Sequence, residues 1–188
     1  MLNEGQLYIV VDIEADGPTP GLHSMLSLAA IATDSEGEVS RFYEKLLTLD
    51  DAKPDPDTSE WWKSQPEAWA EVNSDQQPPV SVMQDFCRWL DGLKCKPIFA
   101  ASPIGLDYAF VSWYLFRFAG RNPFMNEKNA IRTLDIRSYI AGKYNLTFDD
   151  SSRPKLPASL TAGMPEHTHR AIDDAAGYAY LLRRILND

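Results

Sequence analysis

The feature that most restricts the fold is a continuous apolar run at residues 6–13, Gln-Leu-Tyr-Ile-Val-Val-Asp-Ile. A strand that is apolar on both faces must be covered on both sides, so this run predicts a central strand in a sheet flanked by helices. The run ends in two acids, Asp12 and Glu14, shortly before the turn at Gly17-Pro18. Because side chains two residues apart share one face of a strand, both carboxylates should point to the same side of the sheet.

Turn residues and changes in apolar periodicity divide the rest of the chain into further elements. The sequence predicts strands at 25–33, 38–48, 97–101 and 131–136, helices starting at 58 and 66, helices over 80–92, 105–119 and 136–143, a long loop over 145–166, and a C-terminal helix to about 186. This order predicts one α/β domain over residues 1–188. Its mixed five-stranded sheet combines an antiparallel meander of the first three strands with two strands added parallel to the first.

The C-terminal helix carries two adjacent aspartates that should face opposite ways. At 100° per residue its apolar stripe runs through Ala171, Ala175, Tyr178, Leu181, Leu182 and Ile185. Asp174 falls inside this stripe, whereas Asp173 falls on the opposite side and is predicted to be a surface residue. An inward carboxylate is costly unless a metal ion, a basic partner or a shifted pKa compensates its charge.

Asp107 and His169 complete the set of candidate site residues. Alone, Asp107 is explained as an acid favoured by the dipole at the start of a helix, and His169 as a structural histidine in a loop. The four acids together, with no basic residue close to most of them in sequence, favour hard divalent cations, Mg²⁺ or Mn²⁺. Two such ions held by carboxylates are an established arrangement for phosphodiester cleavage.

Three segments resemble the motifs of the DEDDh 3′–5′ exonuclease family, which includes RNase T, oligoribonuclease and the proofreading subunit of bacterial DNA polymerase III. The segments are residues 12–17 (Asp-Ile-Glu-Ala-Asp-Gly), 106–111 (Leu-Asp-Tyr-Ala-Phe-Val) and 169–175 (His-Arg-Ala-Ile-Asp-Asp-Ala). They occur in the family's order and together span nearly the whole chain. The resemblance implies an RNase H-like fold and hydrolysis from a 3′ end that releases nucleoside 5′-monophosphates.

The resemblance also implies a role for each matched residue. Asp12 would bridge two metal ions, Glu14 and Asp174 would bind the ion nearer the attacking water, and Asp107 would hold the second ion. His169 would act as the general base, for which an imidazole is well suited near neutral pH. The motif spacing selects His169 rather than His167.

Substrate contacts are predicted around the same motifs. The chain departs from the family here, because Ser102-Pro103-Ile104 replaces a region that often carries an Asn, and a Leu replaces the usual Phe before Asp107. The candidate substrate-binding residues are Ile13, Ala15, Gly17, Ser102, Leu106 and Arg153. For Arg153, and for Lys155 beside it, the alternative is an ordinary solvated loop.

Several aromatic residues have two explanations. Trp113, Tyr114, Phe116 and Phe118 are predicted to belong to the core, although an exposed member would suit a dimer contact or a stacking platform for bases. Trp61 and Trp62 lie in a proline-rich region, where core packing competes with a role as a lid or a base-stacking pair.

Composition limits the partners. The formal net charge of −9 is concentrated in residues 1–60, which hold 13 Asp and Glu but only 3 Lys and Arg. This excludes a broad basic surface for long nucleic acid and leaves short single-stranded RNA or DNA 3′ ends in a local cleft. Residues 1–6 show no secretory signal and the chain has no transmembrane-length apolar run, so we expect a cytoplasmic protein without membrane contact, either monomer or homodimer.

Two other functions fit the same fold. A non-catalytic nucleic-acid-binding module would require a broken set of site residues, but all five positions are filled. An RNase H-like endonuclease would not require the third-motif histidine, which this chain has at His169. The sequence thus favours the exonuclease, and it leaves RNA and DNA both open as substrates, because that choice depends on contacts to the 2′-hydroxyl.

Overall fold

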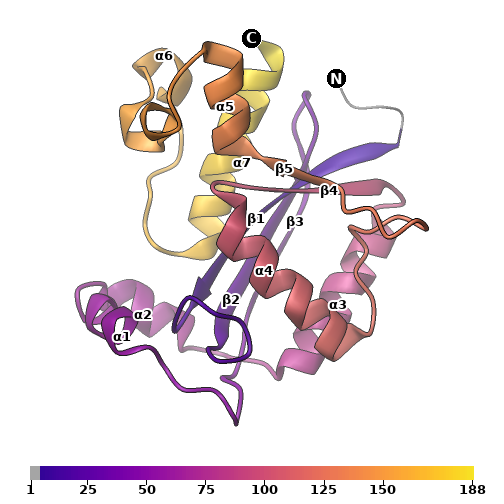
Figure 1. Ribbon diagram of the computed structural model, residues 1–188, viewed down its shortest axis with the longest axis vertical. Helices are drawn as coiled ribbons and strands as arrows, with labels where there is room; N and C mark the ends of the chain where they lie inside the picture. Colours follow the sequence, from indigo (N-terminus) through magenta and orange to yellow (C-terminus); the bar gives the residue numbers. More distant parts are fainter. Residues whose placement is uncertain (1–4) are drawn as a thin grey trace.

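The computed structural model describes residues 5–188 (Figure 1). The strands are β1 (Gln6–Ala15), β2 (Met25–Thr33), β3 (Glu38–Lys45), β4 (Lys96–Ala101) and β5 (Thr133–Asp135). The helices are α1 (Pro56–Lys63), α2 (Pro66–Val72), α3 (Pro79–Gly92), α4 (Ile104–Tyr114), α5 (Ile136–Tyr144), α6 (Ala158–Thr161) and α7 (Ala171–Asn187), with the π-helical turn η1 (Leu115–Ala119) and the 3₁₀ turns η2 (Asp149–Ser151) and η3 (Arg153–Lys155).

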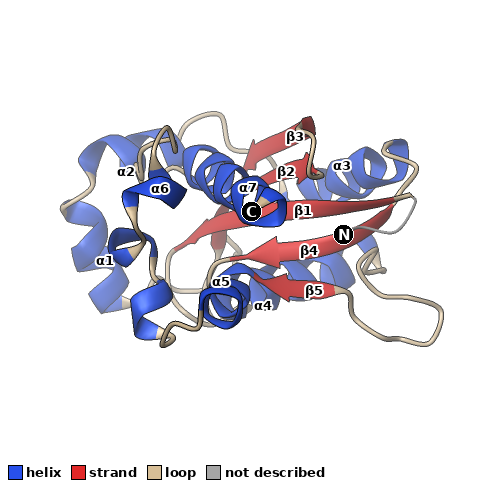
Figure 2. Cartoon of the chain, turned by 90° about the horizontal axis from the view of Figure 1, so that it is seen from above, coloured by secondary structure: helices blue, strands red, loops and turns tan. Residues whose placement is uncertain are grey.

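The five strands form one mixed sheet in the order β3-β2-β1-β4-β5 (Figure 2). β1 pairs antiparallel with β2 and parallel with β4, and β5 continues the parallel half. The predicted fold class is therefore confirmed, including the antiparallel meander and the central position of β1. β4 pairs with β1 only as far as Val10, so the carboxyl end of β1, which carries Asp12 and Glu14, is held in register by β2 alone.

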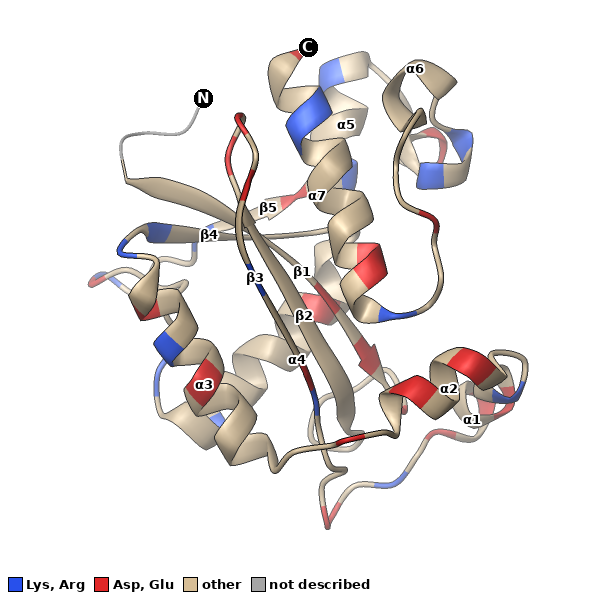
Figure 3. Ribbon diagram, turned by 180° about the vertical axis from the view of Figure 1, so that it is seen from behind, with Lys and Arg blue, Asp and Glu red and all other residues tan. Residues whose placement is uncertain are grey.

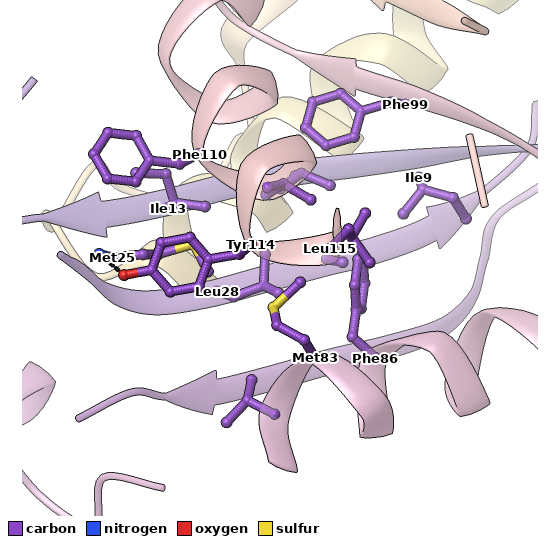
Figure 4. Close-up of a cluster of buried hydrophobic side chains, with 14 of the residues drawn as sticks. Ile9, Ile13, Met25, Leu28, Met83, Phe86, Phe99, Phe110, Tyr114 and Leu115 are labelled. Atoms are coloured by element: carbon purple, nitrogen blue, oxygen red, sulfur yellow. Dashed lines mark hydrogen bonds between the residues drawn. The ribbon is translucent and has the colours of Figure 1, made fainter. Parts of the chain in front are cut away.

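Helices cover both faces of the sheet, as the apolar run in β1 required. On one face, Ile9, Val11 and Ile13 pack with α3, α4 and η1; Figure 4 shows this core, in which the Tyr114 hydroxyl accepts a hydrogen bond of 2.8 Å from the Met25 N–H. On the other face, Val10 packs with α5, α6 and α7. Asp12 and Glu14 follow the even-numbered face of β1 and so lie on the side of α7.

A third, smaller cluster places α1 and α2 beside the carboxyl end of β1. Trp62 is 2% exposed and packs with Leu26 and the apolar side of α2, and its indole N–H donates to the Ala15 carbonyl at 3.0 Å. Trp62 therefore belongs to the core, in agreement with the favoured prediction. Its neighbour Trp61 remains 40% exposed.

Several details differ from the sequence-based prediction; the strand predicted over 131–136, for example, is confined to Thr133–Asp135. β3 stops at Lys45 instead of 48, because the chain then turns to bond with Gln77. The helix predicted over 105–119 widens into the π turn η1 for its last five residues, and Phe116 is 52% exposed rather than in the core. The predicted loop 145–166 contains η2, η3 and α6, because two residues of this segment, Leu156 and Leu160, are buried in the core on the side of α7.

No helix within residues 5–188 combines the length and the apolar character needed to cross a membrane. Residues 1–4, on which part of the prediction of no secretory signal rests, lie outside the described residues.

Candidate active site

The site begins with the two acids at the end of β1. Asp12 lies opposite Ala29 and Glu14 opposite Ser27 in the antiparallel pairing with β2, so the register of the sheet fixes both backbone positions. Each of the two residues is partly buried. Figure 3 shows acidic segments of β1, α4 and α7 gathering in this region.

Asp174 approaches these acids from the first turn of α7. The helix begins where the Arg170 carbonyl accepts bonds from the N–H groups of Asp173 (2.9 Å) and Asp174 (3.1 Å), and acids are favourable in such a first turn. Asp174 is 1% exposed, and carboxylate oxygens of Asp12, Glu14 and Asp174 all lie within 4.8 Å of one another. Asp173 points away, and its side chain is 36% exposed beside Arg170.

Asp107 reaches the site from the other face of the sheet. It lies in the first turn of α4, whose start is fixed by a bond of 2.7 Å from the Ile104 N–H to the Asp135 carboxylate at the end of β5. Asp107 is 8% exposed, and its Oδ1 accepts a bond of 3.0 Å from the Ile13 N–H, between the two β1 acids. The four acids predicted from sequence are therefore brought together, from three elements.

Burial and mutual repulsion raise the pKa values of these carboxyls. Desolvation, followed by the charges of Asp107, Glu14 and Asp174, holds the pKa of Asp12 well above its usual range. Desolvation and the charge of Asp174 raise the pKa of Glu14 to about 9. Desolvation raises the pKa of Asp107 to about 7, although the bond from Ile13 N–H opposes this shift.

This cluster fits divalent cations. Several carboxylates are crowded together at low exposure, and each is destabilised by its neighbours when ionised. Oxygen-rich carboxylate sets of this kind suit hard ions such as Mg²⁺ and Mn²⁺, whose charge offsets the repulsion.

The pKa shifts predict how the stability of the metal-free protein responds to pH. The pKa of Glu14 is about 9 in the folded protein, above its ordinary value of 4.5. Between about pH 4.5 and about pH 9 the folded protein therefore keeps a proton on Glu14 that the unfolded protein has lost. The Glu14 contribution to stability is therefore present below about pH 4.5 and is lost as the pH rises through 9. In EDTA, Glu14→Gln should melt at a higher temperature than the natural sequence at about pH 8, and the difference should shrink toward about pH 5.

Thermal melts of both proteins across this pH range test the prediction. Glu36→Gln, which changes an exposed glutamate at the hairpin tip, is the matched control and should show no pH-dependent difference. Adding Mg²⁺ should reverse the sign of the effect, because the natural carboxylate then gains a cation. If the difference in melting temperature between Glu14→Gln and the natural sequence in EDTA does not depend on pH, the pKa of Glu14 is not raised in the folded protein.

Two histidines lie beside Asp174, whereas the motif spacing selects only one of them. His169 is partly buried, and its ring packs edge-on against the Trp61 ring with a centroid distance of 5.1 Å. Desolvation, followed by the charge of His167, lowers the pKa of His169. His167, which the motif spacing had set aside, is the residue in direct contact: its Nδ1 lies 2.7 Å from the Asp174 Oδ1. The His-Thr-His spacing was the available signal for this second residue.

Arg153 is a second residue whose position the sequence did not fix. Its Nη1 lies 4.0 Å from the Asp174 Oδ1 and makes no hydrogen bond, its Nη2 donates to the Pro165 carbonyl, and its side chain is 16% exposed. The alternative of a solvated loop is therefore wrong for Arg153. It holds for Lys155, whose side chain is 54% exposed and pairs with Asp150.

The other predicted substrate-binding residues have different surroundings. Ile13 is buried in the core and its N–H is bonded to Asp107, while the Ala15 carbonyl is bonded to Trp62. Gly17 packs so tightly that a Cβ there would lie 2.2 Å from the His23 ring. Leu106 is 44% exposed at the start of α4.

Ser102 and Arg153 line a cavity of about 700 Å³ that also includes Tyr178 and His167.

A mixed sheet of this strand order, with clustered carboxylates at the end of its central strand, defines the class of RNase H-like nucleases. The RNase T exonuclease family model matches residues 9–182, so the chain belongs to this family of exonucleases. Its members with this arrangement of three motifs are DEDDh 3′–5′ exonucleases, enzymes that hydrolyse phosphodiester bonds. The family predicted from the three motifs is therefore confirmed.

Individual relatives show the same likeness. The chain is 26% identical to the 3′-5′ DNA exonuclease Cap18 of Escherichia coli, and the match covers 98% of this chain and 94% of Cap18. The nuclease domain of 3′hExo, a DEDDh family member bound to rAMP, superposes with a TM-score of 0.72 at 13% identity, covering 97% of this chain and 92% of that domain. E. coli Exonuclease I in complex with a dT13 oligonucleotide superposes with a TM-score of 0.73 at 16% identity, covering 96% of this chain and 41% of that enzyme.

Proposed function

We propose that this exonuclease uses two divalent ions, Mg²⁺ or Mn²⁺, to remove nucleotides from single-stranded 3′ ends and releases nucleoside 5′-monophosphates. The observation that carries the proposal is the convergence of Asp12, Glu14 and Asp174 within 4.8 Å, with Asp107 hydrogen-bonded to the backbone between the first two. Such a cluster is unfavourable by itself and becomes favourable when it binds cations.

Each acid has a proposed role in holding the ions. Asp12, whose carboxyl interacts with those of Asp107, Glu14 and Asp174, would be shared by both ions. Glu14 and Asp174 would complete the site of the ion beside the attacking water, and Asp107 would serve the other. When bound, such ions make a water molecule more nucleophilic and stabilise the charge on the leaving oxygen.

His169 is the proposed general base. It lies in the loop entering α7, close to Asp174, and its lowered pKa keeps the imidazole neutral and able to accept a proton from the attacking water near pH 7. The edge-on Trp61 ring limits where this imidazole can point. His169 therefore combines a suitable protonation state with a restrained position.

We infer that single-stranded DNA is a substrate of this enzyme. Cap18, a relative that matches nearly the full length of this chain, is a DNA exonuclease, and Exonuclease I binds a single-stranded DNA oligonucleotide in its complex. The uneven negative charge of the chain suits a short strand end in the cleft rather than a long wrapped duplex.

Cleavage of matched DNA and RNA oligonucleotides tests this function. With Mg²⁺, a 5′-labelled single-stranded DNA should be shortened stepwise from its 3′ end, and the released products should be 5′-mononucleotides. A phosphorothioate or inverted nucleotide at the 3′ end should stop the reaction, while the same block at the 5′ end should not. Internal cuts in the 3′-blocked strand would indicate the endonuclease alternative, and binding without any product would indicate the non-catalytic module.

A further inference from the structure

A second set of metal-ligating atoms overlaps the edge of the carboxylate cluster. Ligand atoms of His167, His169 and Asp174 all lie within 4.8 Å of one another. The His167 Nδ1 is 2.7 Å from the Asp174 Oδ1, and the two imidazole ring centroids are 4.4 Å apart. Two imidazoles and one carboxylate thus converge on one point, which the roles proposed above for single residues do not require.

The local structure holds these three groups together. Asp174 is 1% exposed, and the Thr168 N–H donates to the same Oδ1 at 3.3 Å, so the loop before α7 is bonded directly to this carboxylate. His169 adopts a left-handed backbone conformation with φ of 56°, which is uncommon for a residue with a side chain. Its ring is further restrained by Trp61.

The chemistry of these donors differs from that of the neighbouring acids. Imidazole nitrogens are ligands for zinc and related transition ions, whereas Mg²⁺ prefers oxygen ligands. Zinc sites with three protein ligands, two His and one carboxylate among them, keep a fourth position for water. Tetrahedral zinc with bonds of about 2.0–2.1 Å places its ligand atoms roughly 3.4 Å apart, so the present separations close by small side-chain rotations.

The surrounding charge also favours a cation. Asp12, Glu14 and Asp107 lie nearby and attract a cation, and these three acids outweigh the opposing charge of Arg153, whose Nη1 lies 4.0 Å from the Asp174 Oδ1. The His167 side chain is 46% exposed, which gives an ion access from solvent.

We propose that His167, His169 and Asp174 form an inhibitory site for Zn²⁺, which shares Asp174 with the carboxylate sites for Mg²⁺ or Mn²⁺. An ion bound there would occupy Asp174 and would use the lone pair with which His169 accepts a proton. Micromolar Zn²⁺ should therefore stop the enzyme even when Mg²⁺ is in large excess. The inhibitory effect rests on the proposed function, but binding of the ion does not.

Zinc binding is measured first, by competition with a chromophoric zinc chelator in buffer that contains millimolar Mg²⁺. The natural protein should bind one Zn²⁺, and His167→Gln, which keeps a hydrogen-bond donor near Asp174 but loses the imidazole, should bind it about 100-fold more weakly. Asp12→Asn removes a neighbouring charge but no proposed zinc ligand, so it should weaken zinc binding by no more than about tenfold. Cys95→Ser, which removes the less buried thiol, should leave the zinc affinity unchanged.

Two results would overturn this site. Unchanged zinc affinity in His167→Gln would show that His167 is not a ligand, and a loss in Asp12→Asn as large as the loss expected for His167→Gln would place the ion on the carboxylate cluster instead. Because this measurement needs no cleavage, it is independent of the proposed function.

Inhibition is measured next, with each protein normalised to its own zinc-free rate. His167→Gln should require at least about tenfold more Zn²⁺ for half-inhibition than the natural protein. Zinc that binds to the natural protein without slowing cleavage would refute the inhibitory role.

Discussion

Asp12→Asn is expected to reduce Mg²⁺-dependent release of nucleotides by about 10³-fold or more, with the fold retained. Asp12 interacts electrostatically with Asp107, Glu14 and Asp174, and it is the carboxylate proposed to serve both ions. Asparagine keeps the size of the side chain but removes the charge that attracts cations. The measurement is kcat/KM for the stepwise shortening of a 5′-labelled DNA strand at saturating Mg²⁺.

The same substitution should not destabilise the metal-free protein. Removing one buried like charge relieves repulsion, so the melting temperature of Asp12→Asn in EDTA should equal or exceed that of the natural sequence. Asp173→Asn is the matched control, since it makes the same chemical change beside Asp174 on the outer side of α7, and it should retain most activity. Full activity in Asp12→Asn, or equal losses in both variants, would contradict the assignment of the metal site.

His169→Gln is expected to lower kcat by roughly 10²–10⁴-fold, the usual range for loss of a general base. His167→Gln should cause a loss at least about tenfold smaller, because His167 is bonded to Asp174 and is not the proposed proton acceptor. The comparison matters because the motif spacing selects His169, whereas the direct contact with Asp174 is made by His167.

Rates at saturating substrate and Mg²⁺, measured across pH, distinguish the two histidines. The general base should impose the acidic limb of the kcat profile, and His169→Gln should remove that limb while His167→Gln preserves it. If His167→Gln instead abolishes the limb and causes the larger loss, then His167 is the base and the motif-based assignment is wrong.

Much of the fold followed from patterns that involve few residues at a time. Period two placed Asp12 and Glu14 on one face, and period 3.6 turned Asp174 inward and Asp173 outward, as the structure shows. The both-sided apolar run of β1 required helices on two faces, and the strand order followed from short connections and right-handed crossovers.

The parts that escaped prediction depend on tertiary packing. The short elements η2, η3 and α6 are too brief to show a period, and they form because Leu156 and Leu160 are buried against α7. The position of Arg153 depends on how that segment folds back over the site. The contacts of Arg153 and His167 with Asp174 could not be predicted, because no repeating pattern in the sequence indicates them.

The hydrogen bond from the Ile13 N–H to Asp107 has a consequence for which mutations this fold tolerates. Because the donor is a main-chain N–H, exchanging Ile13 for another apolar residue leaves the hydrogen bond in place. The bond therefore depends on which position of β1 faces Asp107, and not on which side chain that position carries. A deletion of one residue before Asp12 would turn both β1 acids to the opposite face and offer Asp107 a different amide. In the divergence of such chains, substitutions at the apolar positions of β1 should therefore be accepted far more readily than insertions or deletions within this strand.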